Sequence, residues 1–477
     1  MQKNMSKTNI VFQTSEKIHT SSKNNISVYI EINKNPNDPI KNYFDTVSDR
    51  YIIKIFKDTL NSTFDFELLG GEIYNQLPKM EEIYLYLDSF EEDEIPYILN
   101  GIFLKSWVYD EFKKVEYIKN IIFIHNQHAS ISDKFKELSK ISYGNMLTRY
   151  LTELPSNFLN PTTFPMYIEE FLKDTDVEIS VIHKRQLEEL NCNLILAVGK
   201  GSKYPPNMVV LKKGKNPSKA IIGKGVTFDT GGINLKYDSN SMFDMIHDMS
   251  GAAAIVGALY GTDEEVYGVI PIAENMIGSH SYNIRDVYKS MSGHWVEILH
   301  TDAEGRLLLA DAVFYAYKIL KVKTIITIAT LTGAVGVALG MEYGGLMTNS
   351  CNLKKKLLVA GEKVGEKLWP LPLSKNYDYC LENPRYNLGN CSLIHKGKAG
   401  SIVGGKFIEY FINLKHMINK TNEDYQVEFA HMDIAYVINN SNDLYNKNYC
   451  NGFGVRLLVN YLKSSNSCCK NSCNSCK

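Results

Sequence analysis

The sequence has no long hydrophobic run. In its 477 residues no apolar stretch approaches the roughly 20 residues that a helix needs to cross a bilayer, which argues against a membrane protein. Residues 1–6 are polar and lack the apolar core of a secretion signal, so we expect a cytoplasmic protein. With 52 basic and 53 acidic side chains the net charge is −1, and this balance disfavours a general attraction to nucleic acid or membrane surfaces.

The chain also lacks an internal repeat and the motif G-x-x-x-x-G-K-S/T, which excludes a P-loop nucleotide site. Of the nine cysteines, five are scattered along the chain. These five are expected to be reduced, buried thiols. The other four crowd the C-terminal end, at Cys468, Cys469, Cys473 and Cys476. Their spacing is too tight for an ordinary zinc knuckle and no histidine is near. We therefore predict a disordered, oxidisable tail over residues 464–477.

The composition and length are typical of a globular protein with two domains, since 44% of the residues are hydrophobic and 22% are charged. Residues 1–150 alternate strand-like runs with helix-like segments, such as the one near 95–104, and predict a smaller α/β domain. The strand-like runs are Ile26–Ile30, Tyr51–Phe56, Ile83–Leu87 and Ile121–Ile124. No metal-ligand spacing occurs there, which favours a structural or assembly role.

A helical pattern over 133–154 ends before Pro155 and marks the junction with a second domain, residues 151–463. The candidate strands of this domain are 194–198, 208–211, 220–222, 266–272 and 324–329. Helical segments alternate with these runs. We therefore predict a larger α/β domain with a mainly parallel central sheet and helices on both faces.

The stretch His300–Ala312 has the strongest chemical pattern in the chain. Asp302 and Glu304 are two residues apart, and in an extended backbone both side chains would point to one side, where they can bind one or two divalent cations. Arg306 follows at the same spacing and offers donors for an anion. From Leu307 onward the apolar residues predict a buried helix. Taken alone, the pattern also fits a solvated turn at a helix start.

A second motif upstream favours the metal-binding interpretation over the solvated turn. The glycine-rich stretch Gly223–Lys236 follows a short apolar run and contains Lys224 and Lys236 on either side of Asp229. Asp248 comes twelve residues later, just before a segment of small residues that predicts a helix. Together the two motifs supply four carboxylates, and oxygen ligands of this kind suit zinc, manganese or magnesium ions.

Both motifs resemble those of the leucyl aminopeptidase family, the two-metal exopeptidases that are also called cytosol aminopeptidases. The match is close to letter for letter over G-K-G-V-T-F-D-T-G-G-I-N-L-K and T-D-A-E-G-R-L, and weaker similarity covers most of residues 150–463. The resemblance implies an enzyme that removes the first residue from peptides with a free N-terminus. It also implies a homohexamer.

The resemblance further implies a role for each motif residue. Two divalent metal ions are expected, zinc or manganese with cobalt or magnesium as alternatives, and the nucleophile would be a hydroxide that bridges them. The implied metal ligands are Lys224, Asp229, Asp248, Asp302 and Glu304. Lys236 would stabilise the gem-diolate formed from the substrate, and Arg306 would hold a bicarbonate that serves as the proton shuttle.

A side-chain pocket is implied in the same way. Its residues are Met245, Thr330, Gly333 and Ala435. Because Met245 is flexible and apolar, leucine- or methionine-like first residues are expected to bind best. Tyr436 departs from the family pattern, since most members have glycine there, and it would reshape the pocket. Three histidines neighbour the motifs, namely His247, His300 and His431. The implied ligand set is complete without them.

Two other functions are alternatives at this point. One is a non-catalytic assembly or nucleic-acid-binding protein on the same fold, which the intact set of ligands and the near-zero net charge disfavour. The other is a two-metal phosphoesterase, which would use similar carboxylates but does not explain a lysine among the ligands.

Overall fold

The computed structural model describes residues 7–14, 26–33, 41–45, 50–56, 60–126, 129–237, 239–392, 398–413, 415–418, 424–440, 442 and 444–464. Internal contacts divide the chain into two compact units, Met1–Met146 with Ser441–Asn451, and Leu147–Asn440 with Gly452–Lys477. The division falls inside α3 (Ala129–Glu153), the helix predicted over 133–154. Residues 441–451, which we expected in the second domain, group with the first unit. The four tail cysteines lie outside the described residues, so the disordered tail stays a prediction.

The smaller unit is built on one six-stranded sheet. Its strands lie in the order β1 (Asn9–Gln13), β6 (Asn120–Ile124), β5 (Glu82–Tyr86), β2 (Ile26–Asn33), β4 (Arg50–Phe56) and β3 (Lys41–Asp45). Every neighbouring pair is parallel except β3 with β4. The four strand-like runs and the helix near 95–104 are therefore confirmed.

Two helices of this unit, α1 (Thr63–Gln76) and α2 (Ile95–Lys105), begin and pack through specific polar contacts. Ser62 caps α1, because its side chain accepts from the Asp65 backbone while the Asp65 side chain accepts from Ser62. Buried Asn100 on α2 donates to Glu67 on α1 at 2.7 Å and accepts from Ser142 on α3 at 2.7 Å. This buried network ties three helices together by satisfied polar groups.

The larger unit contains a nine-stranded sheet that is parallel at its centre. The strand order is β16 (Leu368–Pro370), β15 (Gly344–Thr348), β18 (Glu428–Asp433), β14 (Thr324–Ala329), β9 (Lys219–Gly223), β11 (Val266–Asn275), β8 (Asn207–Lys213) and β7 (Val177–Ile182), with β10 (Gly225–Asp229) paired to β11. The strands β18, β14, β9, β11 and β10 are parallel to one another, while β15, β8 and β7 join antiparallel. The predicted mixed α/β fold with a mainly parallel centre is confirmed.

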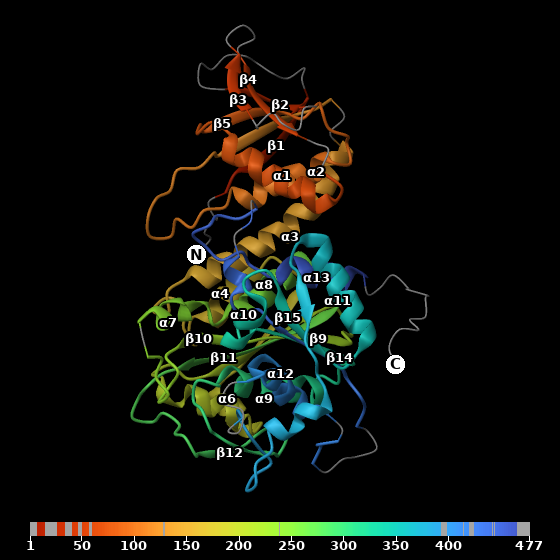
Figure 1. Ribbon diagram of the computed structural model, residues 1–477. Helices are drawn as coiled ribbons and strands as arrows, with labels where there is room; N and C mark the ends of the chain where they lie inside the picture. The colour runs from red at the N-terminus through yellow and green to blue at the C-terminus, as the bar shows by residue number, and fades with distance from the viewer. Residues whose placement is uncertain are drawn as a thin grey trace. The chain divides into compact units, whose positions relative to one another are not determined.

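Helices cover both faces of this sheet (Figure 1). One face carries α8 (Ser250–Gly261), α11 (Cys351–Val364) and α13 (Val455–Ser464), and the other carries α6 (Asn193–Val198), α9 (Gly305–Lys318) and α12 (Gly400–Tyr410). Shorter elements complete the unit: α4 (Phe164–Leu172), α5 (Lys184–Glu189), α7 (Ser239–Phe243), α10 (Gly333–Leu339) and a small sheet of β12 (Val287–Lys289), β13 (Trp295–Glu297) and β17 (Leu388–Gly389). The helix predicted after Leu307 is α9, and its buried face packs on the central strands.

One predicted strand is wrong, because residues 194–198 form helix α6. A short apolar run has no periodicity that separates a buried strand from a buried helix. The helix is favoured by a distant residue: buried Asp311 on α9 accepts from the backbone N–H groups of Leu194 and Ile195 at 2.9 and 3.2 Å. A carboxylate satisfies these otherwise unpaired donors at the start of α6, and the local sequence does not reveal it.

The parallel strands bring distant parts of the sequence to one edge of the sheet. Lys224 follows β9, Asp229 ends β10, Thr330 follows β14 and Asp433 ends β18. Because these strands are parallel, all four residues lie at the carboxyl edge, where open α/β sheets bind their ligands. The two sequence motifs therefore meet at this edge.

Candidate active site

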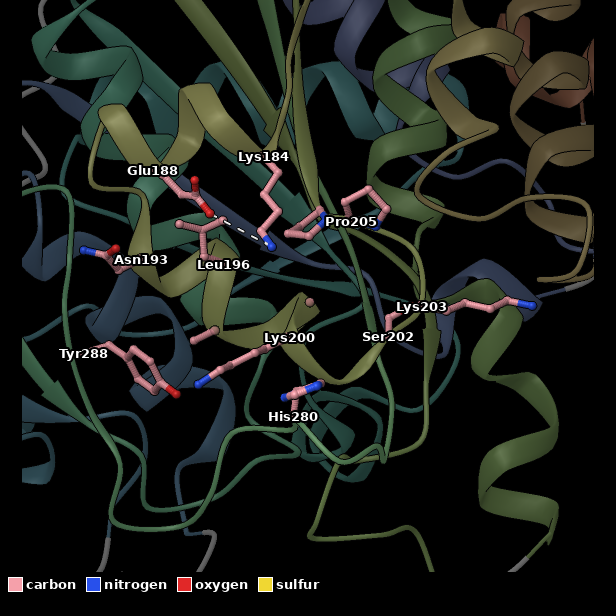
Figure 2. Close-up of a pocket in the computed structure, with 13 residues that line it drawn as sticks. Lys184, Glu188, Asn193, Leu196, Lys200, Ser202, Lys203, Pro205, His280 and Tyr288 are labelled. Atoms are coloured by element: carbon pink, nitrogen blue, oxygen red, sulfur yellow. Dashed lines mark ion pairs between the residues drawn. The ribbon is translucent and has the colours of Figure 1, made fainter.

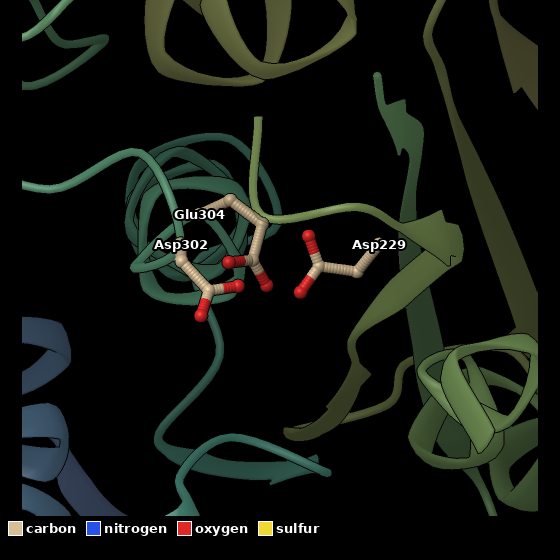
Figure 3. A group of neighbouring side chains, drawn as sticks. All are labelled: Asp229, Asp302 and Glu304. Carbon is tan, nitrogen blue, oxygen red and sulfur yellow. The ribbon is translucent and has the colours of Figure 1, made fainter. Parts of the chain in front are cut away.

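Three carboxylates converge at the carboxyl edge of the larger sheet. Oxygen atoms of Asp229, Asp302 and Glu304 lie within 4.8 Å of one another, and Figure 3 shows the three side chains directed toward a common centre. Asp229 and Glu304 are both 3% exposed. Carboxylates this close and this buried repel one another unless cations lie between or beside them.

The backbone that carries Asp302 and Glu304 differs from the prediction. Residues 301–304 are not extended, because Asp302 lies in a turn and Glu304 has helical dihedral angles of φ −82° and ψ −39° just before α9. Both carboxylates still face Asp229 because Thr301 is clamped to the glycine-rich motif. Its N–H donates to Asn234 Oδ1 at 2.8 Å, and the Asn234 N–H donates to Thr301 Oγ1 at 2.8 Å. The clamp, rather than strand parity, orients the pair.

Two lysines bridge the carboxylates. Lys224 Nζ donates to Asp248 Oδ1 at 2.6 Å and lies 2.8 Å from Glu304 Oε1, while Lys236 Nζ lies 2.9 Å from Asp229 Oδ2 and 2.5 Å from Asp302 Oδ1. Lys224 is almost fully buried, whereas the Lys236 side chain is 14% exposed. The two lysines therefore join both motifs into one charged cluster.

These contacts shift the pKa values of the lysines upward. Burial would lower the pKa of Lys224, but the carboxylates of Asp248, Glu304 and Asp229 outweigh burial and raise it. The pKa of Lys236 is raised in the same way against its own burial, chiefly by Asp229, Glu304 and Asp302. Both amines are thus held as ammonium groups when the carboxylates are their only partners.

The carboxylates are shifted in different directions. Burial and the neighbouring charges of Asp229 and Glu304 raise the pKa of Asp302 to about 8. Burial also raises the pKa of Asp248, although Lys224 opposes the shift. For Asp229 burial acts upward, but Lys236 and Lys224 prevail and lower its pKa. Opposed pKa shifts within one buried cluster are typical of functional sites.

The donor set fits divalent cations. Asp248 Oδ1 accepts from Thr330 Oγ1 at 2.9 Å as well as from Lys224, but buried Asp248 Oδ2 has no hydrogen-bond partner in the described part of the chain. An unsatisfied buried carboxylate oxygen is costly, and a cation would satisfy it. Four carboxylates with a lysine amine are compatible with a pair of divalent metal ions that share ligands.

Several residues that position the site were not found by sequence reasoning. Asn275, the last residue of β11, donates to Asp229 Oδ1 at 2.8 Å and to Thr301 O at 3.1 Å, and Tyr282 also donates to Thr301 O at 2.6 Å. Asn390 donates to His300 O at 2.7 Å. Each is a single polar residue with no local pattern. Only the pairing of Asp229 with Asn275 across β10 and β11 places Asn275 here.

A cavity of about 570 Å³ opens over the cluster. Its lining includes all five residues predicted as metal ligands together with Lys236. The four residues predicted for the side-chain pocket also line it: Met245, Thr330, Gly333 and Ala435. Tyr436 and Ile438 line the same cavity. The structure thus brings the predicted metal-binding and substrate-binding residues together around one cavity.

Arg306 lies apart from these residues and is absent from the described lining of the cavity. It is buried in the first turn of α9, where its Nη1 donates to Asn390 O at 3.0 Å. Burial lowers the pKa of its guanidinium, and Nε has no hydrogen-bond partner among the described residues. An unpaired guanidinium donor at this depth is able to hold an anion.

The three neighbouring histidines are not part of the carboxylate cluster. His300 Nδ1 accepts from the Asp302 N–H at 3.2 Å. His431 is fully buried, and burial lowers its pKa to about 3. His247 lines the cavity, but its Nδ1 atom is buried without a hydrogen-bond partner in the described chain. The group of described carboxylates that could hold a metal ion therefore includes none of these histidines.

A second cavity, of about 580 Å³, lies among α5, α6 and the loop 199–206 of the larger unit (Figure 2). Its charged lining residues are Lys184, Glu188, Lys200 and Lys203. Figure 2 shows Lys184 directed toward Glu188, and the pair is 4.0 Å apart. With Glu188 as the sole carboxylate in its described lining, this cavity has no counterpart of the cluster.

No described helix is both long and apolar enough to span a membrane.

Comparison with known proteins agrees with this geometry. A "Probable cytosol aminopeptidase" of Phytoplasma australiense is 37% identical over 412 residues, which are 83% of this chain and 80% of that protein. A protein of the same description from Rickettsia bellii is 34% identical over 422 residues, 84% of this chain and 82% of that one. Among solved structures, "Bottromycin maturation enzyme BotP in complex with Mn" has a similar fold, with a TM-score of 0.81 and 24% identity. The match covers 92% of this chain and 99% of that one.

The family comparison covers the whole site. The model of the catalytic domain of the cytosol aminopeptidase family matches residues 146–459, a range that contains both motifs, the cavity and the parallel centre of the sheet. Membership supports a metal-dependent aminopeptidase. The chain belongs to the cytosol aminopeptidase family.

Proposed function

We propose that this aminopeptidase uses two divalent metal ions to remove leucine- or methionine-like first residues from peptides. The observation that carries the proposal is the convergence of Asp229, Asp302 and Glu304, with the unpaired Asp248 Oδ2 beside them. The proposed substrate has a free α-amine, because a neutral amine nitrogen could bind one of the two metal ions. A blocked amine would lose this contact.

The proposed ligands divide between the two ions. Lys224, Asp229, Asp248 and Glu304 would hold one ion, and Asp229, Asp302 and Glu304 would hold the other. When bound, two such ions would supply a water of lowered pKa and polarisation of the substrate carbonyl. Zinc and manganese are the first candidates, with cobalt or magnesium as alternatives, and the solved structure with a similar fold is described as a complex with Mn.

The two lysines have different proposed roles. Lys224 lies between Asp248 and Glu304, so it would hold an ion together with them as a neutral amine, since a nearby cation would lower its pKa. Lys236 is nearer the surface of the cluster and keeps its charge. From there it would donate to the oxyanion of the tetrahedral intermediate formed from the scissile carbonyl.

Arg306 is proposed to hold a bicarbonate that would supply a base near the cavity. Support comes from its unpaired Nε and from the absence of a spare carboxylate or histidine base in the described carboxylate cluster. The pocket residues Met245 and Ala435 support a leucine- or methionine-like preference, since both are apolar or soft. A cytoplasmic homohexamer is the proposed state, in keeping with exposed apolar side chains at Val359 and Trp369.

Removal of metal should abolish activity. We expect a chelated, dialysed preparation to lose hydrolysis of a leucyl amide, and Mn²⁺, Co²⁺ or Zn²⁺ to restore it, because the carboxylate cluster then regains its cations. The measurement is the rate of amide hydrolysis alongside elemental analysis. Full activity in a preparation verified to contain no metal would contradict the two-metal proposal.

Substitution of the two lysines should separate their roles. Lys224→Ala should lose bound metal on dialysis, whereas Lys236→Ala should keep metal and lower kcat by roughly 10²–10³-fold, the usual effect of losing one oxyanion donor. Lys236→Arg should rescue poorly, because the guanidinium lacks the compact geometry of an ammonium. Metal content and kcat are measured for each variant. The reverse pattern, with metal lost only from Lys236→Ala, would show that the roles are exchanged.

Asn275→Ala should weaken metal binding although Asn275 is not a proposed ligand. The amide orients Asp229 and holds the Thr301 carbonyl, and loss of such supporting bonds typically costs about 10–100-fold in metal affinity. Tyr282→Phe is the matched control, since it removes only the bond to Thr301 O. Mn²⁺ affinity is measured by titration calorimetry. Equal affinities for the wild type and Asn275→Ala would refute the positioning role.

A further inference from the structure

Tyr436 has a backbone conformation that residues with a side chain rarely adopt. It lies between β18 and the short helix Val437–Asn439, with φ 71° and ψ −42°. This region brings Cβ against the backbone and is disfavoured for every residue except glycine. Four other described non-glycine residues have positive φ, and Tyr436 alone among the five lines the active-site cavity. Strained residues that persist at such places commonly serve function.

The usual structural reasons for a tyrosine do not account for this position. The side chain is 48% exposed, so burial in a core does not hold it. No hydrogen bond joins its hydroxyl to a described residue, although Tyr436 O accepts from the Asn439 N–H at 3.0 Å. Neither burial in a core nor a hydrogen bond of the hydroxyl to a described residue therefore offsets the strain.

The ring is instead seated on helix α10. A Cβ atom added to Gly336 would lie 2.4 Å from Cδ2 and 2.7 Å from Cε2 and Cγ of Tyr436, so only glycine leaves room for the ring. At the other end of the ring, the hydroxyl lies 3.9 Å from the place of a Cβ atom on Gly333. Gly333 and Gly336 are one turn apart on the same face of α10. The ring thus covers one turn of α10 on the side of the cavity.

The ring reaches the proposed side-chain pocket at Gly333. Gly333 is one of its lining residues, together with Met245, Thr330 and Ala435, and Ala435 directly precedes Tyr436. Without the ring, the two glycines would leave the α10 side of the pocket open. With the ring, that side is closed by a flat, rigid group that has few rotamers to give way.

We propose that Tyr436 sets the specificity for the first residue of the substrate by narrowing this pocket. The ring admits slender aliphatic side chains, such as methionine and leucine, and excludes the broad side chains of phenylalanine and tryptophan. This inference rests on the proposed function. Overpacking of a filled site is the physical cause of the exclusion, and a change of this size in an apolar pocket typically alters selectivity by about tenfold or more.

The test compares substitutions that remove the ring with one that keeps it. Tyr436→Gly and Tyr436→Ala should raise kcat/KM for phenylalanyl and tryptophanyl amides relative to the methionyl amide by about tenfold or more, mainly through a lower KM. Tyr436→Phe should retain the wild-type ranking, because the ring remains. Val337→Ala is the matched control on α10, since Val337 is 92% exposed and does not line the cavity. It should also retain the ranking.

Thermal unfolding supplies a second readout. Tyr436→Gly should melt at a higher temperature than Tyr436→Ala, because glycine relieves the strained φ while both variants lose the ring. If the wild type is active, and Tyr436→Gly and Tyr436→Ala rank the amides in the same order as the wild type, the inference about Tyr436 is wrong. The proposed function would not be affected by that result. A metal-loaded wild type that hydrolyses none of the amides would overturn the proposed function, and the inference with it.

Discussion

The balance of buried charge at the carboxyl edge of the larger sheet is the constraint on which the rest of the site depends. Asp229, Asp248 and Glu304 are 3%, 6% and 3% exposed, and buried like charges at short range destabilise a fold strongly. Lys224 and Lys236 offset part of that repulsion through direct ion pairs. Carboxylate oxygens that the lysines leave unpaired, such as Asp248 Oδ2, are available to divalent cations, and the proposed chemistry follows from this.

The scaffold meets this constraint with rigid elements and close backbone approaches. Parallel strands deliver Lys224 and Asp229 to one edge, and α9 begins at Gly305 directly against the Lys224 side chain. A Cβ atom on Gly305 would lie 2.4 Å from Lys224 Cε, so a side chain there would displace Lys224 from its carboxylate partners. The clamp between Thr301 and Asn234 then fixes the two motifs relative to each other. A site on strand ends and a helix start is held more precisely than one on free loops.

Prediction from the sequence was most successful for features that depend on a local pattern of residues. Two motifs were enough to predict a site near Asp229 and Asp302, and alternating runs were enough to predict the parallel sheet. Prediction was wrong where distant contacts decide: Asp311 turns an apolar run into α6, and the Thr301 clamp replaces the expected extended backbone. Asn275 was missed because its role exists only through the pairing of β10 with β11. The proposed roles of Lys236 and Arg306 still rest on resemblance and geometry together.

The number of metal ions bound per chain tests the central claim most directly. Metal-free protein is titrated with Mn²⁺ in a calorimeter, with Asp248→Asn alongside the wild type and circular dichroism to verify that both are folded. We expect two ions for the wild type and one for Asp248→Asn, because Asp248 is a proposed ligand of one ion only. A folded wild type that binds no Mn²⁺, or an Asp248→Asn variant that still binds two ions with wild-type affinity, would contradict it.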